Sequence, residues 1–256
     1  MKILRGMYTV WVYLWFVSVF LLLFPFFVLF VQRESWKPAG QFLNKLWAYI
    51  VFGFCLLPTE VIFRFRPSAH KSYVYCANHS SYMDIPSLCY ALPGYFMFIG
   101  KASLAKVPLF GYTFRKLHIP VNRSNAKSKF ESIQKSLEAI DKGRSVAYFP
   151  EGTIPRLKQP AMLPFKDGAF RVAIEKQVPV IPITIPYNWL ILPDDGKFTP
   201  HRHLMKVILH EPIETKGMTL DDLEDLKQKT YNIIMQELLI QHRLLEERNR
   251  KKHSQK

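Results

Sequence analysis

The first sixty residues contain two apolar stretches. The first, Val10–Val31, is 22 residues long and carries no charge. As an α-helix it would extend about 33 Å, enough for the hydrocarbon core of a bilayer. The second, Leu46–Thr59, has 14 uncharged residues, a length typical of an interfacial or re-entrant helix. The pattern predicts an N-terminal pair of membrane-anchoring helices within residues 1–63.

A signal peptide and a buried core helix are the alternatives for Val10–Val31. The stretch is longer than the apolar region of a signal peptide, and no small-residue cleavage site follows it. Its length also favours a membrane segment over a core helix. Basic residues flank both stretches, so the positive-inside rule gives no decisive orientation. Whether the first stretch crosses the bilayer fully stays open.

The rest of the chain alternates short β-rich runs with helical patterns. Several β-rich runs are apolar on both faces, which is typical of buried strands. A helix is expected over Lys127–Lys142, and a long one from Thr219 towards Glu247. The pattern predicts one α/β domain over residues 64–247, followed by a basic, disordered tail at 248–256. The expected strands are Ser72–Ala77, Phe96–Ile99, Ile119–Val121, Ser145–Phe149, Val180–Ile185 and Leu204–His210.

Composition and charge narrow the function classes. Hydrophobic residues make up 49% of the 256 residues and charged residues 21%, which excludes disorder over most of the chain. The net charge of +15 suits an anionic partner: a nucleic acid, an acidic membrane or a phosphorylated substrate. The sequence has no RNA-binding aromatic signature and no zinc ligand set, which argues against nucleic acid. The three cysteines form no C-x-x-C pair, so a disulfide scaffold is excluded.

A histidine and an aspartate follow the first expected strand of the domain. His79 and Asp84 are five residues apart across a strand-to-helix turn. An aspartate there can reach one imidazole nitrogen and leave the other free to take a proton from a hydroxyl. No G-x-S-x-G nucleophile motif exists, so the pair fits a general base better than a hydrolase triad. Taken alone, the spacing also fits a loop histidine beside a helix-capping aspartate.

Two further strand ends carry polar chemistry. After the strand at 145–149, Glu151, Gly152 and Thr153 form a loop whose glycine permits close approach and whose threonine offers a hydroxyl. Arg123 ends the strand Ile119–Val121, where a guanidinium is well placed to bind a phosphate. An ordinary turn and a solvated surface arginine are the plain alternatives for these two features.

Together, in this order and spacing, these blocks resemble the glycerolipid acyltransferase family, specifically 1-acyl-sn-glycerol-3-phosphate acyltransferases. The resemblance extends over about residues 60 to 215. It implies a mixed sheet flanked by helices, with an N-terminal membrane-associated helical pair. The matching stretches are the N-H-x(4)-D block Asn78–Asp84, Pro108–Gly111 with Ile119–Arg123, the F-P-E-G-T block Phe149–Thr153, Val178–Pro182, Lys101–Leu104 and Phe165–Phe170.

The resemblance also implies a reaction. His79, oriented by Asp84, would deprotonate the sn-2 hydroxyl of lysophosphatidic acid, and the alkoxide would attack the thioester of acyl-CoA or acyl-carrier protein. The product would be phosphatidic acid, formed in phospholipid biosynthesis without a covalent acyl-enzyme. No metal or organic cofactor is expected. We expect a membrane location, with the catalytic domain on the cytoplasmic face and membrane lipids as partners.

The same resemblance assigns the substrate-binding residues. Arg123 would hold the phosphate, and Glu151, Gly152 and Thr153 would organise the glycerol backbone. Lys101 is a further candidate. The sequence departs from the family pattern at two positions: Ile154 stands where an arginine usually follows E-G-T, and Leu117 where a glycine usually precedes I-P-V. We hypothesise that Arg156 replaces the contact missing at Ile154.

Two other functions stay open. Within the same class, the acceptor is glycerol-3-phosphate or another lysolipid. In a different class, the chain is a non-catalytic basic protein that binds membrane surfaces, and removal of His79 would then leave its function intact.

Overall fold

The computed structural model describes residues 2–155 and 157–254. Its centre is a seven-stranded sheet in the order β1-β7-β6-β2-β5-β3-β4. Strands β2 to β6 are mutually parallel, β7 is antiparallel to β6, and β1 pairs in parallel with β7. The expected mixed sheet is confirmed. The strands are β1 (Thr59–Phe63), β2 (Val74–Ala77), β3 (Phe96–Lys101), β4 (Ile119–Val121), β5 (Ser145–Tyr148), β6 (Val180–Thr184) and β7 (Met205–Leu209).

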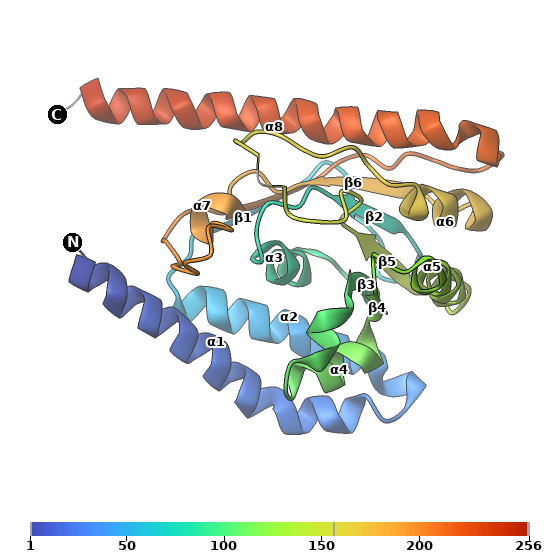
Figure 1. The fold of residues 1–256 in the computed structure, drawn as a ribbon, viewed down its shortest axis with the longest axis horizontal. Coiled ribbons are helices and arrows are strands. Elements are labelled where there is room, and N and C mark those ends of the chain that lie inside the picture. The colour runs from blue at the N-terminus through green and yellow to red at the C-terminus, as the bar shows by residue number, and fades with distance from the viewer. Residues whose placement is uncertain (1, 156, 255–256) are drawn as a thin grey trace.

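Helices cover both faces of this sheet (Figure 1). Alternate residues of β2 point to opposite faces, so Tyr75 and Ala77 join one core cluster while Val74 and Cys76 join the other. The first cluster packs under α1 (Lys2–Phe30), α2 (Lys37–Phe54), α3 (Asp84–Ala91) and α4 (Phe110–Leu117). The second packs under α5 (Ala126–Asp141), α6 (Gly168–Lys176) and α8 (Leu223–Ser254).

The six expected strands all form, and one strand was missed. We had placed Thr59–Phe63 at the end of an apolar helical stretch, whereas it is the edge strand β1. Its five residues are all half-buried and include Glu60, so the sequence carries no alternating pattern. The pairing with β7 decides its conformation. The sheet thus takes one strand from within residues 1–63.

The two N-terminal helices differ in their surroundings. In α1 the stretch Ile3–Phe30 has a mean hydropathy of 2.5 and is largely unburied, and it is long and apolar enough to cross a membrane. By contrast, α2 buries Ala48, Val51 and Phe52 against the domain core. This helix begins at Lys37, before the expected Leu46, and ends at Phe54, ahead of Pro58. It is therefore a layer of the domain as well as a neighbour of α1.

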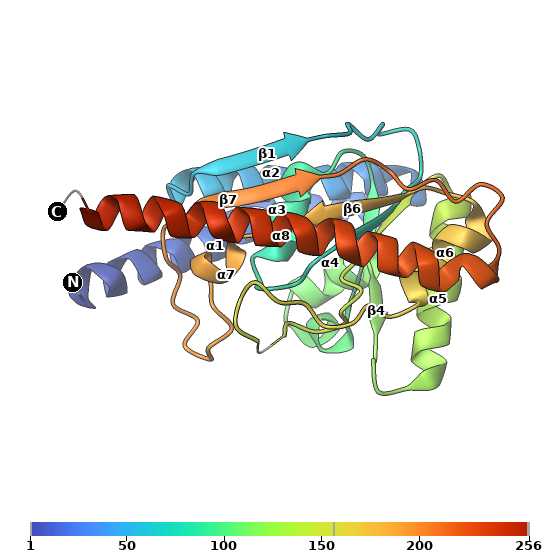
Figure 2. The ribbon, with the colours of Figure 1, turned by 90° about the horizontal axis from the view of Figure 1, so that it is seen from above.

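The C-terminal helix is longer than expected. It follows η3 (Leu220–Asp222), which Thr219 caps, and it crosses the sheet in Figure 2 before it extends beyond the body of the domain. Residues 248–254, expected to form a disordered tail, are helical. Arginine and lysine are good helix formers, and cations near a helix C-terminus interact favourably with its dipole.

Candidate active site

The candidate residues come from neighbouring strand ends at one edge of the sheet. His79 follows β2, Glu151 follows β5, and Arg123 follows β4, while Lys101 is the last residue of β3. Because these strands are parallel, their carboxyl ends meet at the same edge, the usual place for a ligand site in such sheets.

His79 and Asp84 form a buried dyad. His79 Nδ1 lies 2.9 Å from Asp84 Oδ2, and the two residues are 9% and 0% exposed. The same Oδ2 accepts hydrogen bonds from the backbone N–H groups of Ser80 (2.7 Å) and Ser81 (2.8 Å). A carboxylate that only accepts hydrogen bonds requires His79 to donate from Nδ1, so its Nε2 keeps a free lone pair. That is the tautomer a general base needs.

Asn188 completes the shell around Asp84. Its Nδ2 donates to Asp84 Oδ1 at 2.9 Å and to Ser87 Oγ at 2.9 Å. Asn188 is fully buried at the start of the short helix α7 (Asn188–Ile191), just after β6. Sequence reasoning missed this residue, because no spacing rule links it to a position 104 residues earlier.

Glu151 joins the dyad to the next loop. Its Oε1 accepts the backbone N–H of His79 at 2.8 Å, and its Oε2 accepts that of Leu163 at 2.8 Å. Burial raises the pKa of this carboxyl to about 7, with Asp84 adding to the rise and the two backbone donors opposing it. Glu151 is 2% exposed. Its carboxylate fixes the backbone on either side of the site.

The imidazole ring is held in place by an aromatic neighbour. The rings of His79 and Phe149 stack with centroids 4.1 Å apart and an interplanar angle of 17°. Next to it in the chain, Asn78 exchanges two hydrogen bonds with the backbone of Ile185, at 3.0 and 2.7 Å. These contacts tie the end of β2 to the end of β6 and to the loop after β5, so the base has little freedom to move.

A basic pocket of about 630 Å³ opens beside this dyad. Four cationic side chains line it, and no carboxylate does: Lys101, Lys106, Arg123 and Lys166. Gly152 and Thr153 line it as well, so four of the predicted substrate-binding residues meet in one cavity. Arg123 is half-buried and donates a hydrogen bond to the carbonyl of Gly152.

Three features of this pocket were not foreseen. Lys106 comes from η2 (Ala102–Lys106), and Lys166 precedes α6; neither was given a role from the sequence. The predicted Arg156 lies outside the described residues. Of the two departures from the family pattern, Ile154 is half-buried. Leu117 packs against Gly40 of α2, where an added Cβ would lie 3.2 Å from Leu117 Cδ2.

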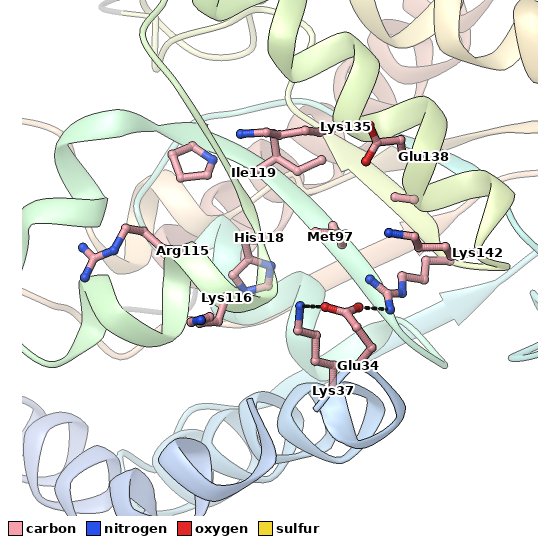
Figure 3. Close-up of a pocket in the computed structure, with 13 residues that line it drawn as sticks. Glu34, Lys37, Met97, Arg115, Lys116, His118, Ile119, Lys135, Glu138 and Lys142 are labelled. Carbon is pink, nitrogen blue, oxygen red and sulfur yellow. Dashed lines mark hydrogen bonds and ion pairs between the residues drawn. The ribbon is translucent and has the colours of Figure 1, made fainter. Parts of the chain in front are cut away.

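A second, smaller basic pocket lies at the opposite ends of β3 and β4 (Figure 3). It measures about 190 Å³ and contains none of the predicted site residues. Glu34 bridges Lys37 and Arg144 there, and these hydrogen bonds hold its pKa at about 2. Burial lowers the pKa of the neighbouring His118 to about 3. No general base therefore stands in this pocket, and the chemistry belongs to the first.

No metal site accompanies the dyad in the described part of the chain, where no group of three or more His, Cys, Asp or Glu side chains is arranged to hold an ion. The three cysteines Cys55, Cys76 and Cys89 are buried, and burial raises the pKa of each thiol. The candidate chemistry therefore rests on the histidine.

Comparisons with known proteins agree with this arrangement. The chain is 32% identical over 191 residues to the chloroplastic 1-acyl-sn-glycerol-3-phosphate acyltransferase BAT2 of Brassica napus, which covers 74% of this chain and 54% of that protein. It is 34% identical to an uncharacterised acyltransferase of Schizosaccharomyces pombe, over 75% of this chain and 69% of that one. The chain thus spans about half the length of the plant relative.

The fold has a solved counterpart. The crystal structure of the 1-acyl-sn-glycerophosphate acyltransferase PlsC from Thermotoga maritima superposes with a TM-score of 0.75 at 21% identity, over 93% of this chain and 98% of that one. The model of the Acyltransferase family matches residues 60–186, which include the dyad, Arg123 and the loop after β5. The chain therefore belongs to the Acyltransferase family.

Proposed function

We propose that this protein is a 1-acyl-sn-glycerol-3-phosphate acyltransferase. It transfers a fatty acyl group from a thioester, acyl-CoA or acyl-carrier protein, to the sn-2 hydroxyl of lysophosphatidic acid and yields phosphatidic acid. Its relatives from Brassica napus and Arabidopsis thaliana carry that name. The observation that carries the proposal is the junction of two parts: a buried His–Asp dyad and a pocket of four cations, with Glu151 bonded to His79 and adjacent to Gly152 in the pocket wall.

The dyad supplies the proton transfers. His79 Nε2 removes the proton of the acceptor hydroxyl as its oxygen attacks the carbonyl carbon of the thioester. Asp84 stabilises the imidazolium that forms, as in other His–Asp pairs. When the tetrahedral intermediate collapses, the C–S bond breaks, and the imidazolium gives the proton to the leaving thiolate. Histidine is thereby regenerated, and general base catalysis of this kind contributes about 10²–10⁴ in rate.

The pocket holds the acceptor. A phosphomonoester fits a cavity lined by ammonium and guanidinium groups without a carboxylate. Arg123 binds the phosphate, and Lys101 and Thr153 contribute further donors. Glu151 acts on the glycerol indirectly, because both its oxygens already accept backbone N–H groups and so shape the loop that carries Gly152.

The lipid substrates set the location. With α1 in or on the membrane, the domain meets both a lysolipid and its product at the membrane surface. We assign the domain to the cytoplasmic face, where acyl thioesters are present, and we expect no metal or organic cofactor.

An acceptor panel tests the proposal. Purified full-length protein in mixed micelles is given acyl-CoA or acyl-carrier protein with lysophosphatidic acid, glycerol-3-phosphate or lysophosphatidylcholine, and the products are identified by mass spectrometry. The proposal predicts that lysophosphatidic acid is acylated fastest. A faster reaction with another acceptor would change the substrate, and transfer to none of them would leave a non-catalytic membrane-binding protein.

A further inference from the structure

The phosphate pocket needs a cation that the sequence pattern does not supply in its usual place. Ile154 follows the E-G-T block, where the resembled family has an arginine, and an aliphatic side chain cannot bind a phosphate. Arg123 alone is partly engaged, because it donates to the carbonyl of Gly152. A second cation must therefore come from elsewhere in the fold.

Lys166 is placed to supply it. Its backbone N–H donates to the carbonyl of Pro150 at 2.9 Å, and three residues earlier Leu163 donates to Glu151 at 2.8 Å. These two bonds align the segment before α6 with the loop after β5. They bring an ammonium group from a different part of the chain over the loop that lacks its arginine.

The ammonium group occupies the space above Gly152. A Cβ added to Gly152 would lie 2.5 Å from Lys166 Nζ, so a side chain there would displace the lysine. Gly152 also has φ +77°, a conformation that favours glycine. Both facts require glycine at this position, and one of them exists only because of Lys166.

The charge of Lys166 is free for a ligand. It forms no ion pair with a carboxylate in the part of the chain that the structure describes, and its neighbour Asp167 is paired with Lys227 instead. Lys166 lines the same cavity as Lys101, Lys106 and Arg123. Four cations without a counter-ion repel one another, and a doubly charged anion relieves that repulsion better than a singly charged one.

We infer that Lys166 binds the acceptor phosphate in place of the arginine missing at Ile154, and that it makes the enzyme selective for a phosphomonoester over a phosphodiester lysolipid. A phosphomonoester carries close to two negative charges at neutral pH, whereas a phosphodiester carries one. This inference rests on the proposed function, since it assigns a residue to the acceptor of that reaction.

Kinetics of Lys166→Ala test it, with lysophosphatidic acid and lysophosphatidylglycerol as the two acceptors. We expect the KM for lysophosphatidic acid to rise about tenfold, the size of a lost charged hydrogen bond, with little change in kcat or in the KM for the acyl donor. The ratio of kcat/KM between the two acceptors should fall, and Lys166→Arg should restore most of it. Lys229→Ala, which removes an exposed lysine from α8, is the matched control.

The outcomes separate the inference from the proposed function. If wild-type protein acylates lysophosphatidic acid and Lys166→Ala leaves both its KM and the acceptor ratio within twofold, Lys166 does not bind the phosphate. An equal loss with both acceptors, unrelieved by arginine, would make Lys166 structural and overturn the inference too. Failure of the wild type to acylate any acceptor would instead contradict the proposed function.

Discussion

Asn188 and Asp84, 104 residues apart in the chain, are joined by a hydrogen bond of 2.9 Å in the buried interior beside the active site. The bond occupies Asp84 Oδ1, while Oδ2 receives His79 and two backbone N–H groups. Asp84 thus accepts donors on both oxygens, and the orientation of the imidazole depends on all of them. Asn188 is a positioning residue that acts through Asp84.

Asn188→Ala should lower kcat by about tenfold to a hundredfold, since a displacement of about 1 Å in a catalytic group costs that much. The KM for the acceptor should stay within twofold, because Asn188 does not line the phosphate pocket. Ser87→Ala is the matched control: it removes the other acceptor of the same amide and leaves the bond to Asp84. Equal losses of kcat in both variants would show that only local packing matters.

Glu151 should make the folded protein less stable as the pH rises. Its pKa is about 7 in the folded state and returns to its ordinary value near 4.5 on unfolding, so the folded state holds the proton more tightly. Stability therefore falls between those two values as the pH increases, by about 3 kcal/mol in total.

Glu151→Gln removes this titration. Melting temperatures of both proteins, measured in the same detergent from pH 4.5 to 8, should show the wild type losing stability relative to the variant across that window. Parallel curves for the two proteins would mean that Glu151 does not titrate there.

Arg123→Ala should raise the KM for the acceptor far more than the KM for the acyl donor. A charged hydrogen bond contributes about 1.5–3 kcal/mol, hence about 10–150-fold in binding. Because Arg123 also donates to Gly152, some loss of kcat should accompany it. Initial rates with each substrate varied in turn give both constants. A similar rise in both KM values would indicate that the arginine only supports the loop.

Deletion of α1 should abolish membrane binding. A variant lacking residues 1–32 keeps α2 and β1, which the domain uses in its core and in its sheet. A deletion of residues 1–63 removes both and should aggregate. In vesicle flotation, the full chain should float and the shorter deletion should stay in the lower fraction. Flotation of the shorter deletion to the same extent would place the membrane contact elsewhere.

The sequence alone predicts the strands whose neighbours are buried on both faces. β2 and β6 stand out because Val74–Ala77 and Val180–Thr184 are fully buried, so their composition reflects the core. β1 does not, since it is half-buried throughout and its pairing with β7 depends on a strand more than 140 residues away. Edge strands are decided by their partners more than by their own residues.

The same distinction holds in the site. His79 and Asp84 are predictable because a five-residue spacing across one turn brings them together. Asn188 and Lys166 are not, because each reaches the site only after the chain has crossed the sheet again. The family pattern identified the loop after β5, while the cation that stands above Gly152 required the structure.

The most direct test of the central claim is the rate of acyl transfer to lysophosphatidic acid by His79→Ala, compared with wild type at saturating acyl thioester. The ring packs only on Phe149 at the edge of the core, so the variant should remain folded by its melting temperature. We predict a fall in kcat of at least 10². A folded variant that keeps more than about a tenth of the wild-type rate would contradict general base catalysis by His79, and with it the mechanism proposed for this protein.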